Sequence, residues 1–152
     1  MANAKQLILT QLDKKTSPFK ALSTIQVPVN GWINYVRNSL NMTLAQLGNR
    51  LGTSRQGVHK MEEREASGAI TLKAMQEIAK SLNGQFVYGI VPQESFKKIV
   101  DDRAETIARN IVLRTHGHMV LEAQGNTEDR IEQAIAETAD ELKREMSRVL
   151  WD

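Results

Sequence analysis

The sequence predicts a mainly α-helical fold with one short strand, and three observations lead to this prediction. Apolar residues recur at spacings of three and four along most of the chain, which places them on one face of successive helices. Hydrophobic residues make up 41% of the 152 residues but aromatic residues only 5%, which favours aliphatic packing between helices. Residues typical of helix ends, such as Ser, Thr and Gly, stand at the boundaries of these periodic segments.

The first part of the chain, residues 1–30, is expected to form an N-terminal arm. Residues 5–12 have the pattern of a short helix. Residues 16–30 contain Pro18 and Pro28, so we expect them to be irregular or partly extended. In the helix expected next, four apolar residues share one face: Trp32, Ile33, Val36 and Leu40.

Residues 44–51 and 55–64 have the pattern of two short helices joined by a tight turn. Gly52 stands at the end of the first, where a residue tolerant of left-handed backbone angles is needed, and Ser54 can cap the second. Gly48 costs about 1 kcal/mol of helix propensity relative to Ala, so we interpret it as a point of close approach between the helices. The inward-facing apolar positions are Leu44, Leu47, Leu51, Val58 and Met61. This spacing predicts a helix-turn-helix.

The other side of the second helix carries polar and basic residues suited to reading DNA. Arg55 can bond guanine with two hydrogen bonds, and Gln56 can do the same with adenine. Lys60 is expected to contact phosphate, and Ser54 with the nearby backbone amides is expected to hold another. The predicted DNA-binding residues are Ser54, Arg55, Gln56, His59 and Lys60. The alternative interpretation is a solvated helix face in some other three-helix packing.

The segment from about Trp32 to Leu82 resembles the Cro/repressor-type helix-turn-helix family, also called XRE. The matching features are the run GTSRQGVHKME and the helix TLKAMQEIAKSL, which Thr71 can cap, at the family's spacing. The resemblance implies a lambda repressor-like helical bundle that binds double-stranded DNA. Two positions depart from the family pattern. Leu44 replaces a Gln, which removes a polar group expected to contact phosphate, and Gly48 replaces an Ala.

The full length is similar to the mobile mystery protein A family in the runs GWINYVRNSL, FVYGIVP and HGHMVLEAQ. In that family a helix-turn-helix protein is encoded beside a Fic-domain protein. The resemblance therefore implies an alternative role as an antitoxin or adaptor that binds a Fic-domain partner through its C-terminal helices. The usual Fic-inhibitory pattern, Ser or Thr followed four residues later by Glu and then Gly or Asn, is absent from the sequence. This absence disfavours direct neutralisation through that motif.

After the DNA-binding domain expected over residues 31–84, residues 85–152 are expected to form a strand and two amphipathic helices. Residues 85–92 favour a strand, whose partner is either residues 27–29 or the same segment of a second copy. The helical stripes that follow are Phe96, Val100, Ala104, Ile107 and Ile111, then Ile131, Ile135, Ala139, Leu142, Met146 and Val149. Because helix-turn-helix proteins commonly bind two half-sites as symmetric dimers, we expect this C-terminal region to form a homodimer.

Charge is divided unevenly along the chain. Residues 1–92 carry eleven Lys and Arg against five Asp and Glu, a net charge of +6, whereas residues 93–152 carry nine against thirteen, a net charge of −4. This division suits a protein that places its first region on phosphates. The absence of cysteine excludes disulfides and thiolate zinc sites. The N-terminal apolar run is too short for a signal peptide or a membrane span, so we expect a cytoplasmic protein.

His116, His118 and Glu122 raise the question of a metal site. His118 and Glu122 are four residues apart and could share a helical face, but no HExxH motif or second carboxylate cluster accompanies them. Gly117 between the histidines is more simply interpreted as a helix break.

Taken together, these patterns predict a transcriptional regulator, a repressor of its own operon, with no enzymatic activity, metal or cofactor.

Overall fold

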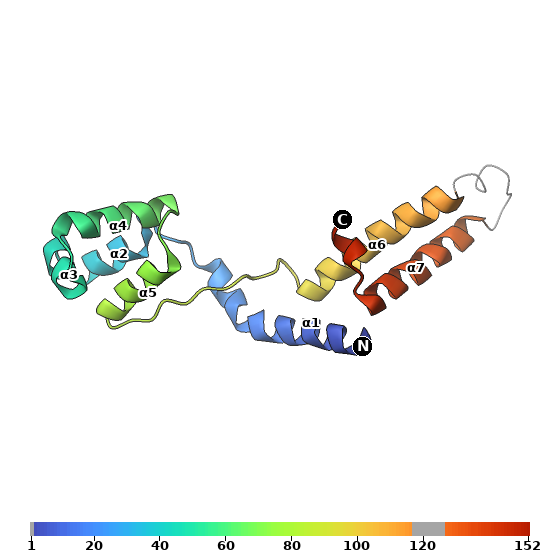
Figure 1. The fold of residues 1–152 in the computed structure, drawn as a ribbon, viewed down its shortest axis with the longest axis horizontal. Coiled ribbons are helices and arrows are strands. Elements are labelled where there is room, and N and C mark those ends of the chain that lie inside the picture. The colour runs from blue at the N-terminus through green and yellow to red at the C-terminus, as the bar shows by residue number, and fades with distance from the viewer. Residues whose placement is uncertain (1, 117–126) are drawn as a thin grey trace. The chain divides into compact units, whose positions relative to one another are not determined.

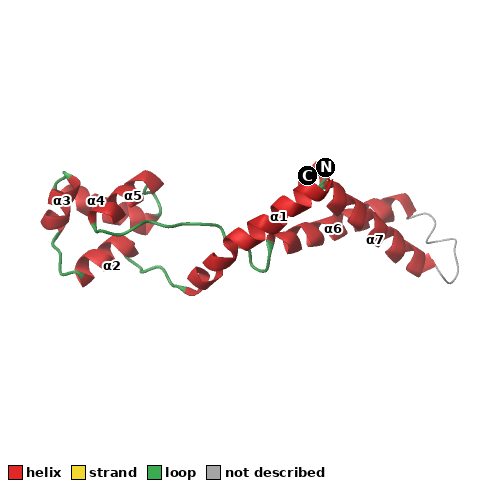
Figure 2. Cartoon of the chain, turned by 90° about the horizontal axis from the view of Figure 1, so that it is seen from below, coloured by secondary structure: helices red, strands yellow, loops and turns green. Residues whose placement is uncertain are grey.

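The structure is a computed structural model that describes residues 2–116 and 127–152. Helices are the regular elements of this part of the chain, and no strand occurs in it (Figures 1 and 2). The helices are α1 (Ala2–Thr16), α2 (Gly31–Ser39), α3 (Leu44–Leu51), α4 (Arg55–Ser67), α5 (Leu72–Ser81), α6 (Phe96–His116) and α7 (Thr127–Glu145). Two 3-10 helices, η1 (Ser17–Thr24) and η2 (Arg148–Trp151), complete the order. The prediction of a mainly α-helical fold is confirmed.

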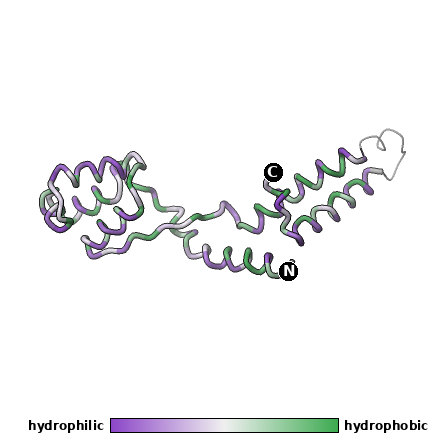
Figure 3. Tube along the Cα trace, in the orientation of Figure 1, coloured by the Kyte–Doolittle hydropathy of each residue, from purple (hydrophilic) through white to green (hydrophobic). Residues whose placement is uncertain are grey.

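The chain forms two compact units. Residues Ala21–Gly89 form one, which we call the inserted unit because it interrupts the other. Residues Met1–Lys20 and Ile90–Asp152 form the second, which we call the terminal unit. Hydrophobic and hydrophilic residues alternate along the helices of both units (Figure 3), as expected for helices that each bury one face.

The inserted unit is a bundle of α2, α3, α4 and α5 around one small core. Each of the four helices contributes to it, and the buried apolar side chains are Ile33, Leu47, Val58, Met75 and Ile78. Partly buried residues close its edges, among them Leu44, Leu51 and Met61. The helices therefore pack through the apolar faces that the spacing of three and four predicts.

Local capping fixes the ends of α3 and the start of α4. Thr43 and Gln46 form a reciprocal capping box at α3, with Gln46 N donating to Thr43 Oγ1 at 3.1 Å and Thr43 N donating to Gln46 Oε1 at 2.8 Å. Gly52 ends α3 in the left-handed conformation, with φ of 71°. Ser54 caps α4 by accepting a hydrogen bond from Gly57 N at 3.0 Å. The predicted roles of Gly52 and Ser54 are confirmed.

Gly48 is a point of close approach, as predicted. A Cβ atom added there would lie 2.6 Å from the backbone carbonyl oxygen of Thr53, inside the turn between α3 and α4. Because backbone atoms cannot rotate out of the way, any side chain at this position would push the turn outward. Glycine thus allows the two helices to follow each other over so short a connection.

The start of α2 is capped from a distance, which the sequence did not indicate. Asn30 precedes the helix but provides no side-chain cap. Instead the Glu65 carboxylate, on α4, accepts hydrogen bonds from Trp32 N at 2.7 Å and Ile33 N at 2.9 Å. A Cβ atom on Gly31, whose φ is 84°, would lie 2.7 Å from Glu65 Cδ, so glycine makes room for this carboxylate.

In the terminal unit, α6 and α7 lie side by side and α1 packs against both. The buried residues are mostly small: Val100, Ala104, Ala108, Val112, Ile135, Ala139 and Leu150. Asp13 of α1 caps α6 by accepting hydrogen bonds from Phe96 N at 2.7 Å and Lys97 N at 3.1 Å. The first helix of the chain is thereby joined to its C-terminal helices.

Some local predictions are wrong. Residues 85–92 form no strand in the structure, because their extended backbone pairs neither with residues 27–29 nor with any other described segment. Three residues assigned to apolar faces, Leu40, Ile111 and Val149, are exposed, while Val112 and Leu150 beside the last two are buried. The first helix is longer than predicted, since α1 spans Ala2–Thr16.

Candidate nucleic-acid interface

Helix α4, which follows α3 after a tight turn, has one side in the core and one side in solvent. Val58 is fully buried and Glu62 is 6% exposed, and these two residues fix which side of α4 faces the bundle. The five residues predicted to contact DNA all lie exposed on the first turns of the helix or at its cap: Ser54, Arg55, Gln56, His59 and Lys60. The structure therefore brings together, in solvent, every residue that the sequence selected.

A buried ion pair holds α4 against α2. Arg37 Nε donates to Glu62 Oε1 at 2.5 Å and Arg37 Nη2 donates to Glu62 Oε2 at 3.2 Å, while Asn34 Nδ2 donates to the same Oε2 at 2.9 Å. Arg37 Nη1 also donates to the carbonyl oxygen of Met42 at 2.9 Å. Because all these bonds have fixed directions, the pair determines the rotation of α4 as well as its position.

The environment of Glu62 favours its charged form. Burial by itself raises the pKa of this carboxyl, but the hydrogen bonds from Arg37 and Asn34 and the nearby positive charge of Arg37 outweigh burial and lower the pKa below its ordinary value. Glu62 therefore stays ionised at neutral pH as the partner of Arg37. Glu62 therefore serves the fold, by joining α4 to α2.

The acidic residues of α4 are mostly engaged in the fold. Glu62 pairs with Arg37 and Glu65 caps α2, so both carboxylates are directed at α2. Glu63 forms an exposed ion pair with His59, Nε2 to Oε1 at 3.2 Å. Among the described residues no ion pair is found for Arg55 or Lys60. Their charges are thus available to an anionic partner.

The start of α4 adds hydrogen-bond donors to this surface. Ser54 Oγ accepts from Gly57 N, and Ser54 O accepts from Val58 N at 3.1 Å. The N–H groups of Arg55 and Gln56 precede the first intrahelical bond and point out of the helix end, where the helix dipole is positive. A phosphate placed there would meet both donors and the side chain of Arg55.

Leu44, at the start of α3, is held by apolar packing. Its side chain packs against the core of the inserted unit, next to Met42 and Leu51 in the same cluster. The nearby Gln46 side chain is used by the capping box with Thr43. The start of α3 therefore offers few polar groups to an anion, and the first turn of α4 is the richer source of donors.

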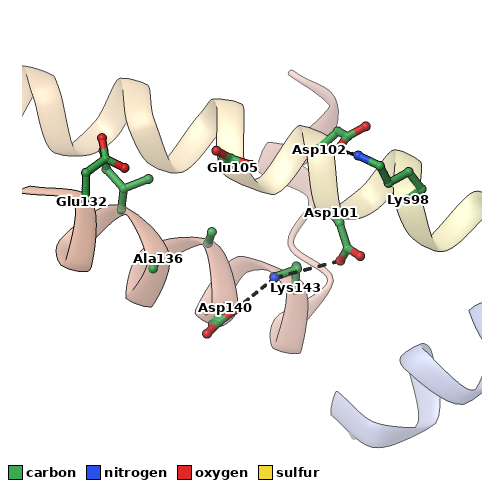
Figure 4. A pocket seen from close by; sticks show the side chains of 10 residues that line it. Lys98, Asp101, Asp102, Glu105, Glu132, Ala136, Asp140 and Lys143 are labelled. Carbon is green, nitrogen blue, oxygen red and sulfur yellow. Dashed lines mark hydrogen bonds and ion pairs between the residues drawn. The ribbon is translucent and has the colours of Figure 1, made fainter.

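The terminal unit contains a hollow between α6 and α7, with a volume of about 420 Å³ (Figure 4). Lysine and aspartate side chains line much of it, and they pair with one another: Lys143 Nζ lies 2.9 Å from Asp140 Oδ1 and 4.0 Å from Asp101 Oδ1, and Lys98 pairs with Asp102. No group of three or more residues able to hold a metal ion is found within residues 2–116 and 127–152. We interpret this hollow as a solvated surface of ion pairs.

Arg109 and Glu132 add an ion pair across α6 and α7. Arg109 Nη1 donates to Glu132 Oε1 at 2.9 Å and Nη2 donates to Oε2 at 3.3 Å. The hydrogen bond from Arg109, followed by its charge, outweighs desolvation and lowers the pKa of Glu132. Both side chains remain well exposed to solvent, so screening by water weakens the attraction between them.

The residues considered for a metal site are only partly described. His116 is the last residue of α6, while His118 and Glu122 lie outside the described residues.

Along the described part of the chain, none of the helices combines the length and the apolar character needed to cross a bilayer. Comparisons with known protein families, curated proteins and solved structures found no match to this chain.

Proposed function

We propose that this protein is a sequence-specific regulator of transcription that binds double-stranded DNA through α4. The observation that carries the proposal is the exposure of Ser54, Arg55, Gln56, His59 and Lys60 on one side of a helix whose other side is fixed by Val58 and Glu62. A helix presented in this way fits the major groove, which admits an α-helix and displays a distinct hydrogen-bonding pattern for each base pair.

The roles of the contact residues follow from their chemistry. Arg55 and Gln56 stand at the start of α4 and are proposed to bond base edges, with guanine and adenine as their preferred partners. Ser54, the amides beside it and Lys60 are proposed to bind phosphates, which fixes the register of the helix on the duplex. His59, already paired with Glu63, is proposed to lie at the edge of the contact.

Charge supports a nucleic-acid partner. The inserted unit has seven Lys and Arg against four Asp and Glu, a net charge of +3. Two of the four acidic side chains, Glu62 and Glu65, are engaged by α2. Phosphate backbones attract such a surface through counterion release, a contribution that falls as salt increases.

We further propose that the protein acts as a homodimer and represses its own operon. A single helix reads only a few base pairs, and two copies related by a two-fold axis would read two half-sites about one helical turn apart. Repression of this kind requires no chemistry, because a dimer bound over promoter DNA blocks the polymerase by occupying its site.

The proposal is tested by selecting bound duplexes from a random double-stranded library and footprinting the enriched site. We expect one enriched sequence with symmetric half-sites. The Arg55→Ala/Gln56→Ala variant should then lose at least 10-fold in affinity for that site, because each bidentate base contact contributes about 1–3 kcal/mol of discrimination.

The matched control is Arg130→Ala/Gln133→Ala. It removes the same side-chain types from exposed positions of α7 and changes net charge equally, so its affinity should equal that of the wild type. If no sequence is enriched, or if both double variants bind the selected site equally well, α4 is not the reading helix.

A further inference from the structure

The inserted unit contains an apolar groove that is not lined by any of the residues proposed to contact DNA. It has a volume of about 470 Å³ and is lined by side chains of α2 and α5 and by residues of the segments 22–27 and 84–87. Side chains of Trp32, Val36 and Leu82 are among those that line it, and none of its lining residues is charged. No residue of α3 or α4 takes part, so the groove is separate from the surface proposed to read DNA.

The apolar side chains around the groove are unusually exposed. Val27 is 68% and Val87 is 57% exposed, and both line the groove. Two aromatic contacts extend the surface beyond it: Tyr35 meets Trp32 edge to face with ring centroids 6.2 Å apart, and Tyr88 stacks on Phe86 at 5.6 Å. Exposed apolar patches of this kind mark sites of protein–protein contact.

The backbone beside the groove is also without partners. Residues 85–91 are extended, and within the described residues no hydrogen bond is found for their N–H or C=O groups. Residues 27–29, the candidate partner in the same chain, do not pair with them, and Pro28 has no N–H group to donate. An extended segment with free donors and acceptors is a template for pairing with another chain.

We infer that this surface, the groove together with residues 85–88, is where a second copy of this chain binds. The lack of charge matters, because a two-fold interface places each patch against its own copy, and like charges there would repel. Two copies of residues 85–88 running antiparallel about the two-fold axis would pair their free backbone groups and cover both grooves. The inference specifies the dimer of the proposed function, but it does not depend on DNA binding.

The position of this surface suits such a dimer. Because the groove is lined from α2, α5 and the two connecting segments, pairing there leaves Arg55 and Gln56 exposed in both copies. The C-terminal helices, which the sequence suggested as the dimer interface, are not needed for it.

The first test measures the mass of the full chain by sedimentation equilibrium from 1 to 200 µM, without DNA. We expect the wild type to be dimeric, and the Val27→Asp/Val87→Asp variant to be monomeric throughout or at least 100-fold weaker in dimerisation. The control Leu72→Asp changes an exposed apolar residue of the same unit, outside the groove, and should dimerise as the wild type does. Circular dichroism establishes that both variants are folded.

The second test uses the absence of cysteine from the chain. Single cysteines are placed in turn at positions 85 to 89, and at position 72 as control, and the variants are oxidised at 10 µM. Near a two-fold axis of antiparallel segments a residue lies within ~4.5–5.5 Å of its own copy, inside the range of a disulfide. We expect cross-linked dimer to peak at one position of 85–89 and to be minimal at 72.

The outcomes are distinct from those of the DNA experiment. A wild type that is monomeric at 200 µM overturns the inference. The groove would then be covered by something other than a second copy, such as a small apolar molecule or the terminal unit of the same chain. A dimer that survives Val27→Asp/Val87→Asp and cross-links equally at all positions overturns it as well. Loss of DNA selection with the dimer intact overturns only the proposed function.

Discussion

The inserted unit and the terminal unit cap a helix in the same way but are stabilised differently. In each, a carboxylate from another helix accepts two backbone N–H groups at a helix start, Glu65 at α2 and Asp13 at α6. The inserted unit also buries an ion pair, Arg37–Glu62, whereas the ion pairs of the terminal unit lie at its surface. The buried bonds of the inserted unit are directional and fix the rotation of α4, whereas α6 and α7 of the terminal unit are held together by apolar packing, much of it between small residues.

The largest expected difference between the units comes from their arginines. Arg37→Ala leaves the Glu62 carboxylate buried without its partner and should cost about 3–5 kcal/mol of unfolding free energy in the inserted unit. Arg109→Ala, which removes an exposed ion pair, should have no measurable effect on the terminal unit. Each unit contains one tryptophan, Trp32 or Trp151, so urea titrations of single-tryptophan variants follow the two units separately.

The double variant Arg37→Met/Glu62→Leu sharpens this prediction. Replacing both members of a buried pair with apolar residues of similar volume leaves no uncompensated charge, and is often neutral or stabilising. Its stability should therefore exceed that of Arg37→Ala. If the two variants are equally unstable, the unpaired charge of Glu62 is not what destabilises Arg37→Ala.

The next effect tests the tight turn of the inserted unit. Gly48→Ala places a methyl group against the carbonyl oxygen of Thr53, and we expect a loss of about 1–3 kcal/mol despite the better helix propensity of Ala. Gly57→Ala meets mainly the hydroxyl group of the Thr53 side chain, which can rotate, so it should cost less. Denaturation monitored by Trp32 fluorescence measures both, and a stabilising Gly48→Ala would contradict the close approach.

The distant caps should produce smaller and parallel losses. Glu65→Ala and Asp13→Ala each remove the acceptor for two helix N–H groups, and each should cost about 0.5–2 kcal/mol. Glu65→Ala should lower the midpoint reported by Trp32 alone, and Asp13→Ala the midpoint reported by Trp151 alone. A shift of both midpoints by either variant would mean that the two units unfold together.

The smallest effect is a pH dependence confined to the inserted unit. The pKa of Glu62 is lower in the folded state than its ordinary value. The stabilisation that ionised Glu62 contributes is therefore complete when the pH is above the ordinary pKa, and it is lost as the pH falls through the folded pKa. Between pH 5 and pH 3 the stability reported by Trp32 should therefore decline more steeply in the wild type than in Glu62→Gln. Equal slopes would show that Glu62 makes no contribution to acid unfolding.

The sequence predicted the inserted unit well because its signals are local. The positions of Gly48, Gly52 and Ser54 specify a turn through contacts within ten residues of one another, and the structure bears out all three. The exposure of the candidate contact residues followed from helical period alone. Their binding to DNA stays a prediction.

The features that the sequence did not indicate depend on residues far apart. Asp13 caps α6 across 83 residues, and Glu65 caps α2 across 33, so neither carries a local pattern. The strand predicted over residues 85–92 is wrong for a different reason. Its β-branched and aromatic residues favour extended backbone, which is present, but a strand also requires a partner that no periodicity in one chain can supply.

The insertion of one unit into the other has a consequence for biosynthesis. Residues 22–27 and 84–87 line the same groove, so the two ends of the inserted unit lie next to each other. On the ribosome this unit is complete before α6 and α7 have been made, while α1 has been synthesised but still lacks the helices against which it packs. The inserted unit, α4 included, can therefore acquire its shape first, and adjacent ends would also allow the unit to be exchanged as a cassette.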